Sequence, residues 1–228
     1  MSERTAEAWD AVAAGFDEAA DHGLTDGTVR AAWAALLERV LPSAPGVIAD
    51  LGCGTGSLSM LAAEQGHRVV GVDFSGAMLA VATSKAGRAS TAGLAGEAGR
   101  TGGVTFVQAD VSTPPLAPAG FDAVLCRHVL WALPDPRASL ERWARLLRPH
   151  GRIVLIEGLW STGAGLPSGR VAALLEGLGR AVAVEPLTDP SYWGGPISDE
   201  RYVVTAISPA VPGRGPSAPG RRHGGGGC

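Results

Sequence analysis

The sequence has few cysteines and no long apolar run. Its 228 residues include three cysteines, Cys53, Cys126 and Cys228, which lie far apart and form no Cys-x-x-Cys pair. This argues against a disulfide framework and a zinc site, and favours a reducing compartment. No apolar segment is long enough to span a bilayer, and the first residues lack the pattern of a signal peptide. We therefore expect a cytoplasmic protein without membrane association or bound metal.

A strong charge imbalance is also lacking. The formal net charge is −3 and 18% of the residues are charged, so nothing indicates a surface that binds a polyanion such as nucleic acid. The hydrophobic content of 46% and the length suit one globular domain with a proper core.

Periodicity divides the chain into three parts. Residues 1–45 carry apolar side chains at helical spacing and predict two helices. Residues 46–208 alternate short apolar runs with helical segments, although residues 87–103 are rich in small residues and predict a mobile connection. Residues 209–228 are rich in proline and glycine and predict a disordered tail.

The middle part predicts an α/β fold with a mostly parallel sheet. Five apolar runs, each short and without polar alternation, are typical of strands buried on both faces: 46–51, 68–73, 104–109, 121–126 and 152–157. Two further strands are predicted at 181–187 and 201–208. Helical patterns cover residues 58–65, 76–86, 139–147 and about 167–179. Strands that alternate with helices in this way form right-handed crossovers around a parallel sheet.

A glycine-rich loop follows the first strand. Gly52, Gly54 and Gly56 follow Asp50 in the order Asp-x-Gly-x-Gly-x-Gly, at the sheet edge where open α/β folds bind ligands. A dinucleotide fingerprint would need glycine where Ser57 stands, and the lysine of a phosphate-binding loop is missing. An acid beside the loop repels phosphate but suits an ammonium or sulfonium group, so the pattern favours a cationic nucleoside.

Acids also end the second and third strands. Asp73 is placed to accept hydrogen bonds from both hydroxyls of a ribose. Asp110 is placed to accept from an adenine amine, while the backbone N–H of Val111 donates to a ring nitrogen. The alternative for Asp73 and Asp110 is a local role as a turn or helix cap.

Five segments together resemble the class I S-adenosylmethionine (SAM)-dependent methyltransferases, in particular a bacterial subgroup that methylates small molecules. They are ADLGCGTG, VVGVDFS, VQADVSTPPL, FDAVLCRHVLWALPDP and LLRPHGRIVLIEG. The resemblance covers about residues 5–208 and implies a Rossmann-like three-layer fold with seven strands in the order 3-2-1-4-5-7-6, the last antiparallel. It also implies SAM as the cofactor and S-adenosylhomocysteine (SAH) as the product.

The resemblance assigns residues to the cofactor. Those expected to bind SAM are Asp50, Gly52, Cys53, Gly54, Gly56, Asp73, Phe74, Asp110, Val111 and Arg127. The N-terminal helices of this family cover the SAM pocket, so residues 1–45 are expected to form a lid that excludes water.

The end of the fourth strand is the place to look for a catalytic residue. His128 is the candidate general base, kept neutral by Arg127 and by the dipole of the following helix. The alternatives are that His128 only caps the turn or lines the pocket, and that transfer proceeds by proximity alone. Trp131 is expected to cover the cofactor or substrate or to pack in the core, and Cys126 to be a buried apolar residue.

Three further residues are candidates for substrate contact. His22 in the lid is one, with a solvated loop histidine as the alternative. Tyr192 and Trp193 are expected either to form an apolar edge over the substrate or to pack at the end of the sheet.

These features predict a SAM-dependent methyltransferase that acts on a small molecule in specialised metabolism, as a monomer or homodimer. The alternatives are a methyltransferase for a protein or RNA substrate and a SAM-binding protein without transferase activity. A nicotinamide-dependent oxidoreductase does not fit Ser57 and Asp110.

Overall fold

The computed structural model describes residues 6–91 and 103–208. The expected tail at 209–228 and most of the expected connection at 87–103 lie outside the described residues, although helix α5 continues through Thr91. Within these ranges, none of the helices is long and apolar enough to cross a bilayer.

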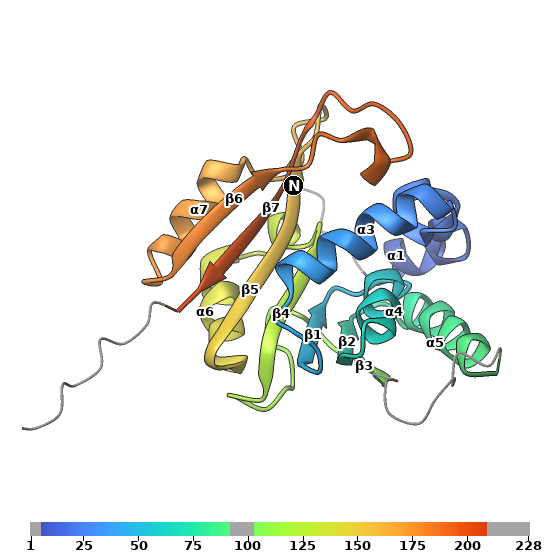
Figure 1. Ribbon diagram of the computed structural model, residues 1–228, viewed down its shortest axis with the longest axis horizontal. Coiled ribbons are helices and arrows are strands. Elements are labelled where there is room, and N and C mark those ends of the chain that lie inside the picture. The colour runs from blue at the N-terminus through green and yellow to red at the C-terminus, as the bar shows by residue number, and fades with distance from the viewer. Residues whose placement is uncertain (1–5, 92–102, 209–228) are drawn as a thin grey trace, which may run out of the picture.

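The core is a seven-stranded sheet. Its strands are β1 (Val47–Leu51), β2 (Arg68–Asp73), β3 (Val104–Gln108), β4 (Phe121–Arg127), β5 (Leu147–Leu159), β6 (Ala181–Pro186) and β7 (Glu200–Ile207). The spatial order is β3-β2-β1-β4-β5-β7-β6, with β7 antiparallel to both of its neighbours (Figure 1). The predicted order and the antiparallel last strand are both confirmed. Strand β5 is longer at both ends than the predicted 152–157.

Helices cover both faces of the sheet and give three layers (Figure 1). The helices that follow the N-terminal segment are α3 (Gly27–Val40), α4 (Ser57–Glu64), α5 (Gly76–Thr91), α6 (Pro136–Leu146) and α7 (Ser168–Glu176). Trp33 and Leu36 of α3 share one core cluster with α4 and the sheet. Trp143 of α6 and Val171 of α7 belong to the cluster on the opposite face.

The N-terminal segment is more broken than the two helices predicted. Before α3 it forms α1 (Ala6–Val12), a 3₁₀ helix η1 (Ala13–Glu18) and one turn of helix, α2 (Ala20–Gly23). The chain turns back here because Ala19 is extended and Leu24 is left-handed, with φ of 52°. Gly23 lies so close to η1 that a Cβ there would be 2.2 Å from the carbonyl oxygen of Asp17. This path places the segment over the edge of the sheet at which the parallel strands end.

Candidate functional site

A cavity of about 780 Å³ lies at the edge of the sheet where the parallel strands end. Its walls come from the N-terminal segment that precedes α3, from the loops that follow β1 to β5, and from Arg201 near the start of β7. Strand order reverses between β1 and β4, and open α/β sheets bind ligands at such a point. The cavity is therefore where the topology of the sheet predicts a ligand.

The glycine loop forms the floor of the cavity. Gly52 has φ of +78°, and a Cβ there would lie 2.3 Å from Cγ2 of Val129, so both conformation and space require glycine. Gly54 has φ of +52°, but the nearest atom to a Cβ there is Cε1 of Phe16 at 3.8 Å. The space beside Gly54 is therefore left open toward the cavity. Cys53 also lines it.

Gly56 differs from the other glycines of the loop. It is not among the residues that line the cavity. A Cβ at Gly56 would lie 3.0 Å from Cζ of Phe106 and 3.1 Å from Cβ of Ala82. The structure thus gives Gly56 a packing role at the start of α4 and does not bring it to the cavity.

Two buried carboxylates stand at the ends of β1 and β2. Asp50 is 2% exposed and its Oδ2 accepts from the Ser59 hydroxyl at 2.5 Å. Burial raises its pKa to about 6, with the nearby charge of Asp73 adding to this and the bond from Ser59 opposing it. Burial also raises the pKa of Asp73, whose oxygens accept from the backbone N–H groups of Gly54 and Ser75, each at 2.9 Å.

The end of β3 adds the third acid to the cavity wall. Asp110 lines it, and both of its carboxylate oxygens accept from Ser112, one from the backbone N–H at 2.7 Å and one from the hydroxyl at 2.8 Å. Asp110 thus forms the local turn that the sequence analysis gave as its alternative role. Each of its oxygens still has a second lone pair that can accept a hydrogen bond from a ligand. Phe74 and Val111 complete this side of the cavity.

Arg127 at the end of β4 ties the N-terminal segment to the sheet. Its Nη1 donates to the carbonyl oxygen of Asp21 at 2.6 Å and its Nη2 to Oδ2 of Asp21 at 2.5 Å. The guanidinium lies 4.4 Å above the ring of Trp33. Arg127 lines the cavity as predicted, but its charge is matched by Asp21 rather than left for a ligand.

His128 is buried in the wall of the cavity. Its backbone has φ of +58°, and its Nε2 is buried with no hydrogen-bond partner among the described residues. Burial lowers its pKa well below the ordinary value, and the charges of Arg127 and Arg201 lower it further. The expected helix dipole is not among these causes, since only the three-residue turn η2 (Leu130–Ala132) follows. The imidazole is therefore neutral because it is buried away from water and lies near positively charged arginines, and not because of a helix dipole.

The predicted substrate residues divide into two pairs. His22 and Trp131 line the cavity; His22 stacks on Phe16 with ring centroids 4.2 Å apart. Tyr192 and Trp193 do not line it. Instead both rings pack edge-on against Trp33, at 5.7 and 5.4 Å, as in the alternative of packing at the sheet end.

The sequence analysis missed three acids that hold the N-terminal segment in place. Asp10 accepts from the Ser75 hydroxyl and Asp17 from the Thr55 hydroxyl, both at 2.5 Å. With the Asp21 pair, these bonds attach the segment to β2, the glycine loop and β4. Each acid follows an aromatic residue or alanine in the sequence, but nothing in the sequence identifies its partner.

The far wall of the cavity was also missed. It is built from residues on the β5–α7 loop and the start of β7: Trp160, Thr162, Ala164 and Arg201. A tryptophan in a loop and an arginine in a strand carry no motif that would single them out.

Charge is distributed unevenly along the cavity. The acids at the ends of the first three strands lie on one side: Asp50, Asp73 and Asp110. The basic groups lie on the side of β4, β5 and β7: His22, Arg127, His128 and Arg201. Asp21 pairs with Arg127 there, and Asp199 pairs with Arg201. One half of the cavity therefore suits a cation and the other an anion or a neutral acceptor. Across the described ranges, no group of three or more His, Cys, Asp or Glu side chains is placed to hold a metal ion.

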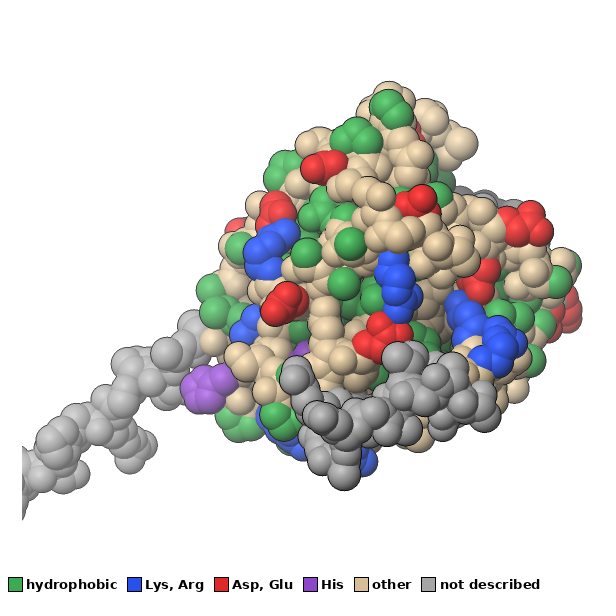
Figure 2. Space-filling view, turned by 45° about the vertical axis from the view of Figure 1, so that its right-hand side comes forward, with side chains coloured by type: hydrophobic (Ala, Val, Ile, Leu, Met, Phe, Trp, Pro, Cys, Tyr) green, Lys and Arg blue, Asp and Glu red, His purple; other side chains and the backbone are tan. Residues whose placement is uncertain are grey.

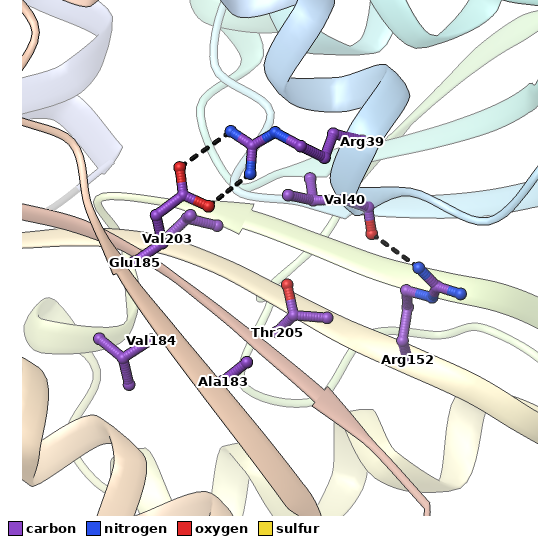
Figure 3. A pocket seen from close by; sticks show the side chains of 8 residues that line it. All are labelled: Arg39, Val40, Arg152, Ala183, Val184, Glu185, Val203 and Thr205. Atoms are coloured by element: carbon purple, nitrogen blue, oxygen red, sulfur yellow. Dashed lines mark hydrogen bonds and ion pairs between the residues drawn. The ribbon is translucent and has the colours of Figure 1, made fainter.

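A second, smaller pocket of about 430 Å³ lies over β6 and β7 beside the end of α3 (Figure 3). Arg39 and Glu185 form a two-pronged ion pair across it, and Arg152 donates to the carbonyl oxygen of Val40 at 3.1 Å (Figure 3). The charged groups that line this pocket are thus occupied with each other or with the backbone. This pocket offers no chemistry comparable to that of the large cavity.

Comparison with known proteins agrees with this geometry. A family described as a methyltransferase domain matches residues 49–155. Demethylmenaquinone methyltransferase of Clavibacter sepedonicus is 38% identical over 118 residues, which cover 52% of this chain and 43% of that protein. Nocamycin O-methyltransferase of Saccharothrix syringae is 39% identical over 125 residues, 53% of this chain and 40% of that protein. The chain thus spans less than half the length of these relatives.

A solved structure extends the match beyond the conserved segment. The magnesium protoporphyrin IX methyltransferase of Synechocystis PCC 6803, solved with bound SAM, superposes with a TM-score of 0.57 at 22% identity, covering 80% of this chain and 78% of that one. Its fold is therefore shared over most of this chain. In sequence the chain is therefore similar to methyltransferases over residues 49–155, and in fold it is similar to a class I SAM-dependent methyltransferase.

Proposed function

We propose that the protein binds SAM and transfers its methyl group to a small molecule. The observation that carries this proposal is the uneven charge of the cavity, which has three acids around an open glycine loop on one side and aromatic and basic groups on the other. SAM, when bound, supplies a methyl group activated on a positively charged sulfur. The acidic half is suited to such a cationic nucleoside, as the names of the relatives also suggest.

The residues of the acidic half fit the parts of SAM. Asp73 faces the cavity at the end of β2 and would hold the ribose hydroxyls, while Asp110 and the N–H of Val111 would hold the adenine. The open space beside Gly54 leaves room for a ligand against the backbone. Asp50 would attract the ammonium group of the methionine part.

The other half would hold the methyl acceptor. Methyl transfer is an in-line displacement that depends on alignment and on a dry site. His128 is neutral and can accept a hydrogen bond from an acceptor hydroxyl, which orients it. The same burial opposes a lasting positive charge on the ring, and catalytic bases work best with a pKa near the working pH. We therefore assign His128 to positioning, with proximity as the main source of rate.

The N-terminal segment is proposed to act as a lid. Trp9, Phe16 and His22 line the cavity, and the bonds of Asp10 and Asp17 close the segment onto the sheet. Such a cover suits a small acceptor better than a polymer, which is the alternative substrate. Basic and acidic side chains are interspersed over the face shown in Figure 2, which gives no focus for nucleic acid. A cytoplasmic location and a monomeric or homodimeric state stay predictions.

Calorimetric titration of the purified protein with SAM, SAH and NAD tests the proposal. We expect binding of both adenosyl ligands at micromolar concentration and no binding of NAD. Failure of SAM and SAH to bind would refute the proposed site. Binding of SAM without any transfer of labelled methyl to quinones, phenols or carboxylic acids would favour the alternative of a SAM-binding protein without transferase activity.

A further inference from the structure

Arg201, at the start of β7, is buried but only partly bonded. Its side chain is 11% exposed and lines the cavity. Nη2 donates to Oδ2 of Asp199 at 3.1 Å, while Nε and Nη1 are buried and have no partner among the described residues. Buried donors are nearly always hydrogen-bonded, because losing water without a replacement is costly. The two free donors therefore indicate a place for a ligand group.

Aromatic rings hold the guanidinium of Arg201 in position. It lies 4.9 Å from the ring centroid of Trp160 and 5.3 Å from that of Trp193. Trp160 in turn lies 5.6 Å from Trp131, and 5.0 Å from His128. These residues make an apolar, flat-sided wall next to the arginine, which suits a planar molecule with a polar group at one end.

The charges near Arg201 leave its positive charge incompletely balanced. Asp199 makes a single hydrogen bond to it, and the neighbouring Arg127 is matched by Asp21. The other titratable groups on this side, His22 and His128, both have lowered pKa values and are neutral. An added anion would thus find an attractive field here, because the other carboxylates of the lining, Asp50, Asp73 and Asp110, lie on the opposite side of the cavity and Asp21 is paired with Arg127.

We propose that Arg201 selects a methyl acceptor that carries an anionic oxygen on a planar conjugated group, such as a carboxylate or a phenolate. The inference rests on the proposed methyl transfer and deepens it by naming the class of acceptor. Hydrogen bonds to a charged oxygen are about twice as strong as neutral ones. An acceptor that is already ionised has no proton to lose, which suits a site whose histidine is a poor base.

The test uses 2-naphthoate and 4-nitrophenolate as anionic probes and 2-naphthamide as the neutral match of the first. Each is titrated at pH 8.5 into the protein, with and without saturating SAH. We expect naphthoate to bind about tenfold or more tightly than naphthamide. Binding of naphthoate alone would indicate a carboxylate acceptor, and binding of nitrophenolate alone a phenolate. Equal affinity for the acid and the amide, with no binding of nitrophenolate, would overturn the proposal.

Variants locate the effect. Arg201→Gln should abolish the preference for the acid, and Arg201→Lys, which keeps the charge without the planar group, should retain part of it. Arg137→Gln is the matched control, because Arg137 is an exposed partner of Glu141 on α6 and lies outside the cavity lining. A preference that survives in Arg201→Gln would overturn the role of Arg201.

Binding of SAH by each variant shows that it is folded and separates the two proposals. If SAH does not bind the unchanged protein, methyl transfer is refuted, while the comparison of acid and amide still decides on Arg201. If Arg201→Gln does not fold, the role of Arg201 is decided by the affinities for naphthoate and naphthamide measured in Arg201→Lys and in the unchanged protein.

Discussion

Asp73 offers the sharpest test of the cofactor site. Its residue is 6% exposed, and its two carboxylate oxygens each accept one backbone N–H at 2.9 Å, from Gly54 in the glycine loop and from Ser75 before α5. Asp73→Asn keeps the shape of the side chain but replaces one acceptor oxygen with a donor. The NH2 group of the new side chain would then face either a backbone N–H, which is also a donor, or a ribose hydroxyl. In both cases the charged acceptor of the hydrogen bond is lost.

The size of the effect follows from these bonds. A hydrogen bond to a charged group contributes about 1.5–3 kcal/mol, so losing one to the ribose should weaken SAH binding by about 10- to 100-fold. The effect on folding should be smaller. Burial already raises the pKa of Asp73, which means that the carboxylate itself is disfavoured in the folded protein, and a neutral amide removes that cost.

Calorimetric titration with SAH measures the change, with Asp122→Asn as the control. Oδ2 of Asp122 accepts a backbone N–H, that of Val47, at 2.8 Å, but at the opposite end of the sheet. We expect the control to bind SAH like the unchanged protein. An Asp73→Asn variant that is folded and binds SAH within twofold of the control would refute the assignment of Asp73 to the ribose.

Three other predictions concern the buried Glu157 of β5, the cavity wall and the lid. Burial raises the pKa of Glu157 from 4.5 to about 8, so the protonated form is favoured on folding and stability falls as the pH rises from about 4.5 to 8. Glu157→Gln should remove that slope and be more stable than the unchanged protein at pH 8.5 in urea denaturation, by about 5 kcal/mol at 1.36 kcal/mol per pKa unit. An unaltered slope would contradict the assignment. His128→Asn should lower kcat about tenfold and leave the affinity for SAH unchanged; asparagine is chosen because it tolerates the positive φ at this position. If kcat and the affinity for SAH fell by the same factor, His128 would instead be a residue that binds the cofactor. Asp17→Asn weakens the lid's bonds to Thr55 and Lys85, so stopped-flow measurements should show SAH leaving several-fold faster, whereas an unchanged rate would mean that the lid does not gate release.

The main features of the fold could be predicted from local patterns. Each parallel strand contains a short apolar run, and buried strands of this kind need no tertiary information to be recognised. Asp50, Asp73 and Asp110 follow such runs, and the carboxyl ends of parallel strands meet at one sheet edge. Their presence around one cavity is therefore largely a consequence of the chain pattern.

The acceptor half of the cavity depended on tertiary structure. Arg201 reaches it because β7 runs antiparallel, so that its beginning lies at the edge where the other strands end. It also needs Gly158 opposite, where a Cβ would lie 2.9 Å from Cδ of Arg201. Trp193 packs against Trp33 and its core cluster on one side and lies 5.3 Å from the guanidinium of Arg201 on the other, without lining the cavity.

The lid shows the same division between local pattern and long-range contact. Helical spacing in the first 45 residues was evident, but the bond between Asp17 and Thr55 joins residues 38 positions apart, and that between Asp21 and Arg127 joins residues 106 apart. Residue type and local spacing therefore determined the sheet, the glycine loop and the acids at the strand ends. The partners of the lid acids, the neutrality of His128 and the free donors of Arg201 were decided by tertiary structure, because burial and charge pairing depend on which distant segments meet.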